Sequence, residues 1–181
     1  QPPGPVTQVQ GQGIVDKYIG DAIMAFFGAP APDEDSAYHA VLSGFDMLEE
    51  LNRFKEFQAT KGRAPVEIGI GINFGTVTIG NIGSERKMDY TVIGDMVNLA
   101  SRIESLTKRY KQKIIVTESV RRQVKPRLLF RMIDRVRVVG RSRATALYAP
   151  YQMPSEKEER AFRAHHKGLR LFYERRFDGI A

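Results

Sequence analysis

The order of apolar and polar positions predicts a chain in which strands and helices alternate. Two short apolar runs, 13–19 and 22–27, flank Gly20-Asp21, a pair of residues typical of a tight hairpin turn. After a proline-rich turn, apolar residues recur at steps of three and four between 35 and 60. This spacing predicts a long amphipathic helix with one buried face.

The rest of the chain continues the mixture. Residues 66–74 alternate like a half-buried strand, and 75–83 is expected to return beside it as its partner in a twisted hairpin. The glycines of 69–83 lack the Gly-Lys-Ser/Thr ending of a phosphate loop, so we expect them to allow close backbone packing. Further elements are expected as a helix at 95–110, a strand at 113–117, a helix at 118–124, a hairpin over 129–149 that turns near 140–142, and a charged helix at 155–176. The fold class predicted is α+β.

Composition narrows the class of protein. The 181 residues suffice for one domain with a real core. We expect no signal peptide and no membrane segment, because no apolar stretch approaches the roughly 18 residues of a membrane span. The absence of cysteine excludes disulfides, thiolate catalysis and cysteine-based zinc sites. A cytoplasmic domain, or the cytosolic part of a larger or membrane-attached protein, is therefore expected.

The net charge of +7 raises the alternative of a nucleic-acid-binding module. Much of this charge lies in 121–143 and 160–176, where the tail mixes its Lys and Arg with Glu. No aromatic stacking pattern accompanies the charge. A basic surface that attracts nucleotide phosphates is the simpler interpretation, and we expect no nucleic-acid partner.

The segment from Tyr90 to Arg102, Tyr-Thr-Val-Ile-Gly-Asp-Met-Val-Asn-Leu-Ala-Ser-Arg, joins a β-rich run to a helix. Asn98 and Arg102 lie four residues apart and project from one helix face. A guanidinium and an amide near a helix start suit a polyphosphate. Taken alone, the segment also fits an ordinary amphipathic helix with a solvated Arg.

The segment from Val15 to Asp21, Val-Asp-Lys-Tyr-Ile-Gly-Asp, places a carboxylate at the hairpin turn. An aspartate there is most often a turn former. This one follows Lys17 and precedes a nearly all-apolar strand, so it lies where a buried sheet meets solvent. Mg²⁺ needs one or two such carboxylates, with substrate phosphates filling its other positions.

Together the two segments resemble the class III nucleotidyl cyclases, the adenylate and guanylate cyclases. The resemblance is close over 13–110 and looser to about 151. It implies a ferredoxin-like core in which antiparallel strands carry helices on one face, with 1–153 as the catalytic domain and 154–181 as a helical tail or linker. In this family the 3′-hydroxyl of the nucleotide attacks the α-phosphate and expels pyrophosphate, with two Mg²⁺ or Mn²⁺ ions per site.

The resemblance also implies a role for each matching residue. Asp21 corresponds to the second metal-binding aspartate, Lys17 to the contact with the adenine ring, and Thr91 to its partner position. Asn98 corresponds to the residue that orients the ribose, and Arg102 to the one that stabilises charge on the α-phosphate. Because a lysine donates to N1 of adenine but meets an N–H in guanine, Lys17 implies ATP as the substrate.

Two departures from the family pattern stand out. Val139-Gly-Arg141 occupies the place of the usual Lys-Gly-Lys, so Arg141 is expected to take over the contact with the terminal phosphates, or that contact is missing. The strand that carries the first metal aspartate has no counterpart. Residues 2–10 instead resemble the start of the family's second helix, and we expect a break within 8–13 of an originally longer sequence.

Three functions therefore stay open: an active adenylate cyclase, a degenerate cyclase-homology domain that binds nucleotide or a partner without turnover, and a nucleic-acid module. For the first, the resemblance implies a head-to-tail homodimer with two shared sites. In such a dimer one hairpin gives Asp21 to one site and Lys17 to the other, where Asn98 and Arg102 join it.

Overall fold

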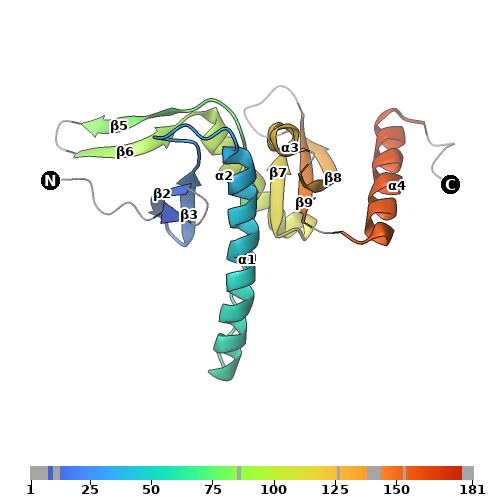
Figure 1. Ribbon diagram of the computed structural model, residues 1–181, viewed down its shortest axis with the longest axis horizontal. Coiled ribbons are helices and arrows are strands. Elements are labelled where there is room, and N and C mark those ends of the chain that lie inside the picture. The colour runs from blue at the N-terminus through green and yellow to red at the C-terminus, as the bar shows by residue number, and fades with distance from the viewer. Residues whose placement is uncertain are drawn as a thin grey trace.

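The structure, a computed structural model, describes residues 8–9, 13–84, 87–125, 127–137, 144–152 and 154–176. Strands and helices alternate along the chain (Figure 1). In order they are β1 (Gln8–Val9), β2 (Gly13–Ile19), β3 (Ala22–Phe26), α1 (Ser36–Thr60), β4 (Ile70–Ile72), β5 (Thr78–Ser84), β6 (Lys87–Ile93), α2 (Asp95–Tyr110), β7 (Ile114–Thr117), α3 (Glu118–Val124), β8 (Leu129–Val136), β9 (Thr145–Tyr151) and α4 (Glu156–Tyr173). The predicted α+β class is confirmed.

The four-stranded sheet forms the core of the molecule, with the strand order β4-β7-β9-β8. Side chains alternate between its two faces, as the strand period requires. Ile114 and Val116 pack with α1 and α3, whereas Ile115 packs with Leu99 and Ile103 of α2. The helices therefore cover both faces of this sheet, and the expectation of helices on one face alone is wrong.

The expected hairpin over 66–83 is also wrong. β4 spans three residues and pairs in parallel with β7, from Ile70↔Ile114 to Ile72↔Val116, while β5 pairs antiparallel with β6. The glycines of this region do allow close packing, but against α2. A Cβ atom on Gly71 would lie 2.4 Å from the carbonyl oxygen of Ala100, and one on Gly75 would lie 2.6 Å from the sulfur of Met96.

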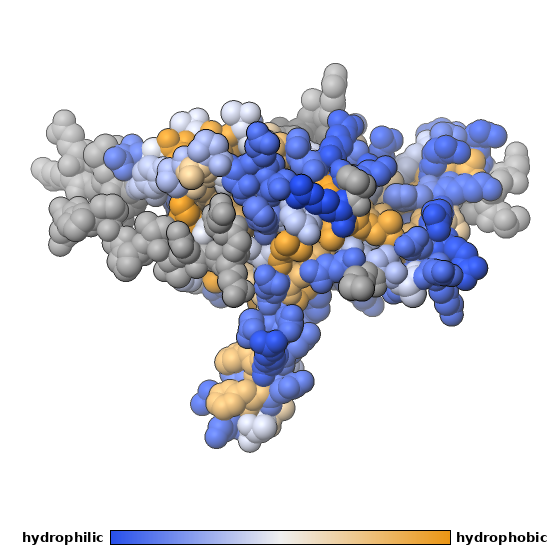
Figure 2. Space-filling model, viewed as in Figure 1, coloured by the Kyte–Doolittle hydropathy of each residue, from blue (hydrophilic) through white to orange (hydrophobic). Residues whose placement is uncertain are grey.

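The long helix α1 buries its apolar side chains mainly in its first half, where Ala37 and Val41 join the core. Its C-terminal half projects away from the sheet, and Figure 2 shows apolar surface among hydrophilic residues on this projection. Phe54 and Phe57 are 44% and 56% exposed there. The predicted helix is confirmed, but its apolar face is buried over only part of its length.

Local chemistry explains why α2 has the bounds predicted for it. Gly94 precedes the helix with φ 147°, a conformation that favours glycine, and Asp95 lies in the first turn, where the helix dipole favours negative charge. Lys108 and Arg109 lie in the last turn, where positive charge is favoured. The helix ends at Tyr110, and the residue after it, Lys111, adopts the left-handed conformation.

The C-terminal helix α4 begins with a capping box formed by Ser155 and Glu158. It packs on β8, an edge strand of the four-stranded sheet, at the opposite end of the molecule from β2 and β3 (Figure 1).

Among the described residues, no helix combines the length and the apolar character needed to cross a membrane. The predicted turn at 140–142, and residues 10–12 of the expected break, lie outside the described part of the chain.

Candidate active site

The hairpin of β2 and β3 carries Lys17 and Asp21. Its strands pair antiparallel up to Ile19↔Ala22, and Gly20 supplies the positive φ of 63° that the turn requires. Asp21 is exposed in this turn, and the side chain of Lys17 is 41% exposed. The predicted hairpin is confirmed, and both candidate side chains are accessible to a ligand.

Thr91 comes from β6, where it pairs with Gly80 of β5. Its hydroxyl donates a hydrogen bond of 2.9 Å to Oδ2 of Asp16 on β2. The ammonium of Lys17 lies 3.4 Å from the same oxygen. The carboxylate of Asp16 thus contacts both Lys17 and Thr91, the two candidate base-binding residues. Asp16 and Thr91 lie 75 residues apart in the sequence.

Asp16 contacts two of the candidate site residues, and it was not singled out from the sequence. It belongs to the Val-Asp-Lys segment, but no role follows from the pattern because an aspartate beside a lysine is common on a solvated strand. Its side chain is in fact fully buried, whereas that of Lys17 is not. A charged residue directly after the apolar pair Ile14-Val15 was the available signal.

Asn98 and Arg102 lie on the first turns of α2, four residues apart, and both are exposed. Asn73 fixes the start of this helix. Its amide nitrogen donates to the carbonyl oxygen of Met96 at 3.0 Å, and its amide oxygen accepts from the hydroxyl of Thr117 at 2.8 Å. The first turn of α2 is thereby tied to the end of β7.

Among the described residues, few side chains could bind a metal. The described residues contain no group of three or more His, Cys, Asp or Glu side chains that could hold an ion. Asp21 offers one exposed carboxylate, which suits a Mg²⁺ ion whose other ligands are phosphate oxygens and water. The Asp21 carboxylate therefore suits a metal ion that binds together with a nucleotide. Arg141, the candidate phosphate contact, lies outside the described residues.

Comparison with known proteins places these features in a family. Residues 10–149 match the model of the adenylate and guanylate cyclase catalytic domain. The chain belongs to this family. The match includes the β2–β3 hairpin, β6 and α2, which are the elements that carry every described candidate site residue.

Curated relatives of this cyclase domain include proteins named as adenylate cyclases. The chain is 44% identical over 140 residues to an adenylate cyclase of Anabaena cylindrica, covering 75% of this chain and 28% of that protein. The chain thus spans less than a third of that relative's length.

Solved structures of adenylyl cyclases and of guanylyl cyclases both resemble the domain. The adenylyl cyclase CyaB from P. aeruginosa matches with a TM-score of 0.71 and 32% identity, over 80% of this chain and 74% of that one. The guanylyl cyclase Cya2 matches with a TM-score of 0.69 and 32% identity, over 80% and 72%. Because both types match almost equally well in structure, the choice between ATP and GTP depends on individual residues.

Proposed function

We propose that this domain is the catalytic domain of an adenylate cyclase, which converts ATP to 3′,5′-cyclic AMP and pyrophosphate. The observation that carries the proposal is the grouping of Lys17 and Thr91 about the carboxylate of Asp16. The identity of 44% with an adenylate cyclase supports the same substrate.

The two residues suit adenine. The Lys17 ammonium donates hydrogen bonds and accepts none, so it matches the N1 acceptor of adenine and opposes the N1–H of guanine. The Thr91 hydroxyl can accept from the 6-amino group of adenine. A guanine ring would instead place its N1–H donor against the Lys17 ammonium. When the complex formed, the N1–H and the ammonium would each lose a hydrogen bond to water without gaining a new one.

In the proposed reaction the 3′-hydroxyl oxygen bonds to the α-phosphorus, and the bond from that phosphorus to the oxygen bridging to the β-phosphate breaks. Pyrophosphate leaves with the electron pair, and the hydroxyl proton passes to solvent. Asn98 would hold the ribose so that the attacking oxygen lies in line with the leaving group, and Arg102 would stabilise the negative charge that develops on the α-phosphate. Both side chains are exposed on α2, where a nucleotide can reach them.

Asp21 would hold the metal, and Mg²⁺ or Mn²⁺ ions, two per site, would polarise the nucleophile and neutralise the triphosphate when bound. Asp21 supplies one carboxylate, and phosphate oxygens and water would fill the other coordination positions of the metal. Arg141 would contact the terminal phosphates.

We further propose that the active unit is a homodimer. Large apolar side chains are exposed around the candidate residues: Tyr18 (68%), Ile19 (57%) and Ile23 (53%) on the hairpin, and Tyr90 (45%) and Ile93 (48%) on β6. Apolar surface beside a polar site is typical of an interface with another protein. A second copy would cover it and complete the site.

The test is an assay of the full-length protein with Mg²⁺ or Mn²⁺ and either ATP or GTP. We expect cyclic AMP, with a kcat/KM for ATP at least about tenfold above that for GTP. Lys17→Glu should erode this preference, because glutamate accepts a hydrogen bond from the N1–H of guanine. The charge reversal Lys167→Glu on α4, far from the hairpin in Figure 1, should leave it unchanged. Comparable turnover of GTP by the parent protein would contradict the assignment.

A nucleotide-binding domain without turnover is the second candidate. It is favoured by the small donor set for a metal among the described residues. Binding of ATP without formation of cyclic AMP, in the presence of Mg²⁺ or Mn²⁺, would support nucleotide binding without turnover and not the adenylate cyclase function.

A further inference from the structure

A β-bulge in β2 brings two consecutive side chains to the same side of the strand. Val15 pairs with Ala25 and Lys17 pairs with Met24, so Asp16 is the extra, unpaired residue between them. Successive side chains of a regular strand point to opposite faces. Here the Lys17 ammonium lies 3.4 Å from Oδ2 of Asp16, which the bulge makes possible.

The carboxylate that the bulge presents is buried and only half satisfied. Oδ2 of Asp16 accepts from Thr91, whereas its other oxygen, Oδ1, is buried without a hydrogen-bond partner within the described part of the chain. Burial of a carboxylate with an unpaired oxygen costs free energy of folding. The unpaired Oδ1 is thus a cost to the stability of the fold, and a role of this carboxylate in recognition would account for that cost.

We propose that Asp16 is a positioning residue that sets the base selectivity of the site by fixing the direction of the Thr91 hydroxyl. A hydroxyl can donate one hydrogen bond and can also accept, so a threonine alone does not distinguish a 6-amino group from a 6-oxo group. A carboxylate only accepts. With its proton directed to Asp16, the Thr91 hydroxyl has only acceptor lone pairs left for a base.

This polarity selects adenine. The 6-amino group of adenine donates to an acceptor, whereas O6 of guanine would face the lone pairs of Thr91. Thr91 is 5% exposed, so water competes little for its proton, and the accessible side chain of Lys17 marks the side from which a base can approach. The inference rests on the proposed adenylate cyclase function and assigns part of its selectivity to a residue that does not itself touch the base.

The substitution Asp16→Asn in the full-length protein tests the inference. The amide that it introduces can donate to the Thr91 hydroxyl, which frees the hydroxyl proton for O6 of guanine. The ratio of kcat/KM for ATP to that for GTP should then fall by about tenfold. A merely structural role for Asp16 would lower the turnover of both nucleotides together and leave the ratio in place. A folded Asp16→Asn protein whose ratio stays within about twofold of the parent value would overturn the inference.

Two substitutions at Thr91 serve as matched controls and do not depend on whether Asp16→Asn folds. Thr91→Val removes the hydroxyl at nearly constant volume and should reduce the ratio to a similar extent, whereas Thr91→Ser keeps the hydroxyl and should retain the ratio. In the Thr91→Val background, Asp16→Asn should have no further effect on selectivity. An unchanged ratio in Thr91→Val, or a full additional effect in the double variant, would each refute the role assigned to Asp16.

Equilibrium binding separates this inference from the proposed function. Dissociation constants for non-cyclisable analogues of ATP and GTP report base selectivity without turnover. If the parent protein makes no cyclic nucleotide, the proposed catalytic function fails, while a preference for the ATP analogue that Asp16→Asn removes would still support the inference. Equal binding of both analogues by the parent protein would overturn it.

Discussion

At the scale of single residues, Asp21 combines exposure with a place in the turn between β2 and β3. We predict that Asp21→Ala lowers turnover by about a thousandfold, since losing the proposed metal ligand would remove about 4 kcal/mol of transition-state stabilisation. The free energy of unfolding should change by less than about 0.5 kcal/mol, because an exposed turn carboxylate contributes little to the folded state. Single-turnover kinetics and urea unfolding measure the two quantities.

Asp46→Ala on the exposed side of α1 is the matched control for Asp21→Ala. It removes another exposed aspartate and should leave both turnover and stability close to the parent values. An Asp21→Ala protein that keeps most of its activity would show that Asp21 is not a metal ligand.

Residue chemistry also limits what the sequence could predict about the site. Lys17, Asp21 and Thr91 could be selected because their motifs are local and specific. The contact that joins two of them could not, because it depends on the bulge at Asp16 and on the approach of β6 to β2. Neither the bulge nor the approach leaves a periodic signal in a single sequence.

At the scale of elements, the contrast between α2 and β4 shows what local sequence determines. The bounds of α2 follow from Gly94, Asp95 and the basic last turn, all of which act within a few residues. The partner of β4 does not follow from local pattern, because parallel neighbours are joined by a crossover and lie far apart in the chain. The nearest strand in sequence was therefore the wrong partner.

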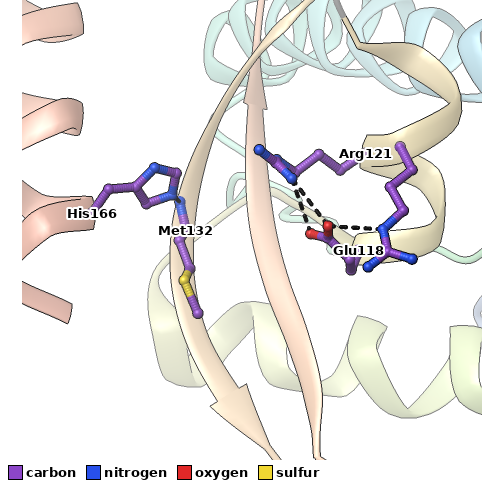
Figure 3. Close-up of polar contacts among 5 residues, drawn as sticks. Glu118, Arg121, Met132 and His166 are labelled. Carbon is purple, nitrogen blue, oxygen red and sulfur yellow. Dashed lines mark hydrogen bonds and ion pairs between the residues drawn. The ribbon is translucent and has the colours of Figure 1, made fainter. Parts of the chain in front are cut away.

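The docking of α4 on β8 depends on polar groups as well as apolar ones. The ring nitrogen Nε2 of His166 accepts from the backbone N–H of Met132 at 3.0 Å, and Figure 3 shows the ring directed at this residue. His165 donates to the carbonyl oxygen of Met132, also at 3.0 Å. The Tyr173 hydroxyl lies 2.5 Å from Oδ1 of Asp134, to which it donates. The two histidines thereby satisfy backbone groups of an edge strand.

We predict that the docking of α4 weakens in mild acid. Burial, and then the charges of Arg121 and His165, lower the pKa of His166, while Glu118 acts in the opposite direction. The detached helix would take up a proton near the ordinary histidine pKa of about 6.5, and the docked helix only at lower pH. Docking is therefore fully stable above about pH 6.5 and loses stability as the pH falls from there toward the lowered pKa of the docked state.

Hydrogen exchange of the backbone amides in α4, compared at pH values above and below about 6.5 after correction for intrinsic rates, measures this loss. His166→Gln retains an acceptor that does not titrate, and it should remove the pH dependence. Asp134 also contacts α4. Burial opposes its ionisation, but hydrogen bonds from Tyr110 and Tyr173 hold its pKa below the ordinary aspartate value. Asp134 therefore stays ionised across the pH range of this experiment and does not account for the effect. Equal protection of α4 in the parent protein across this range would contradict the role of His166.

At the scale of the whole molecule, the exposed apolar side chains of the hairpin and of β6 lie on the same two elements as Lys17 and Thr91. A monomer would leave this surface in water, which costs free energy in proportion to its area. A closed dimer with two-fold symmetry buries the same patch on both copies. Specific activity should then rise with protein concentration, because in the proposed dimer each chain alone would hold only part of a site. A specific activity that stays constant down to concentrations at which sedimentation detects only monomer would contradict the proposed dimer.

The same architecture predicts that two inactive variants restore activity when they are mixed. In the proposed head-to-tail dimer, Asp21 of one chain and Arg102 of the other serve one site. Asp21→Ala and Arg102→Ala should each be inactive alone, while a mixed dimer holds one site with both residues intact and one with neither. At equal concentrations about half of the dimers are mixed, so about a quarter of the parent activity should return. Subunit exchange, followed by fluorescence transfer between labelled chains, serves as the control. No recovery after complete exchange would show that Asp21 and Arg102 of one chain act in the same site, and the shared-site dimer would be wrong.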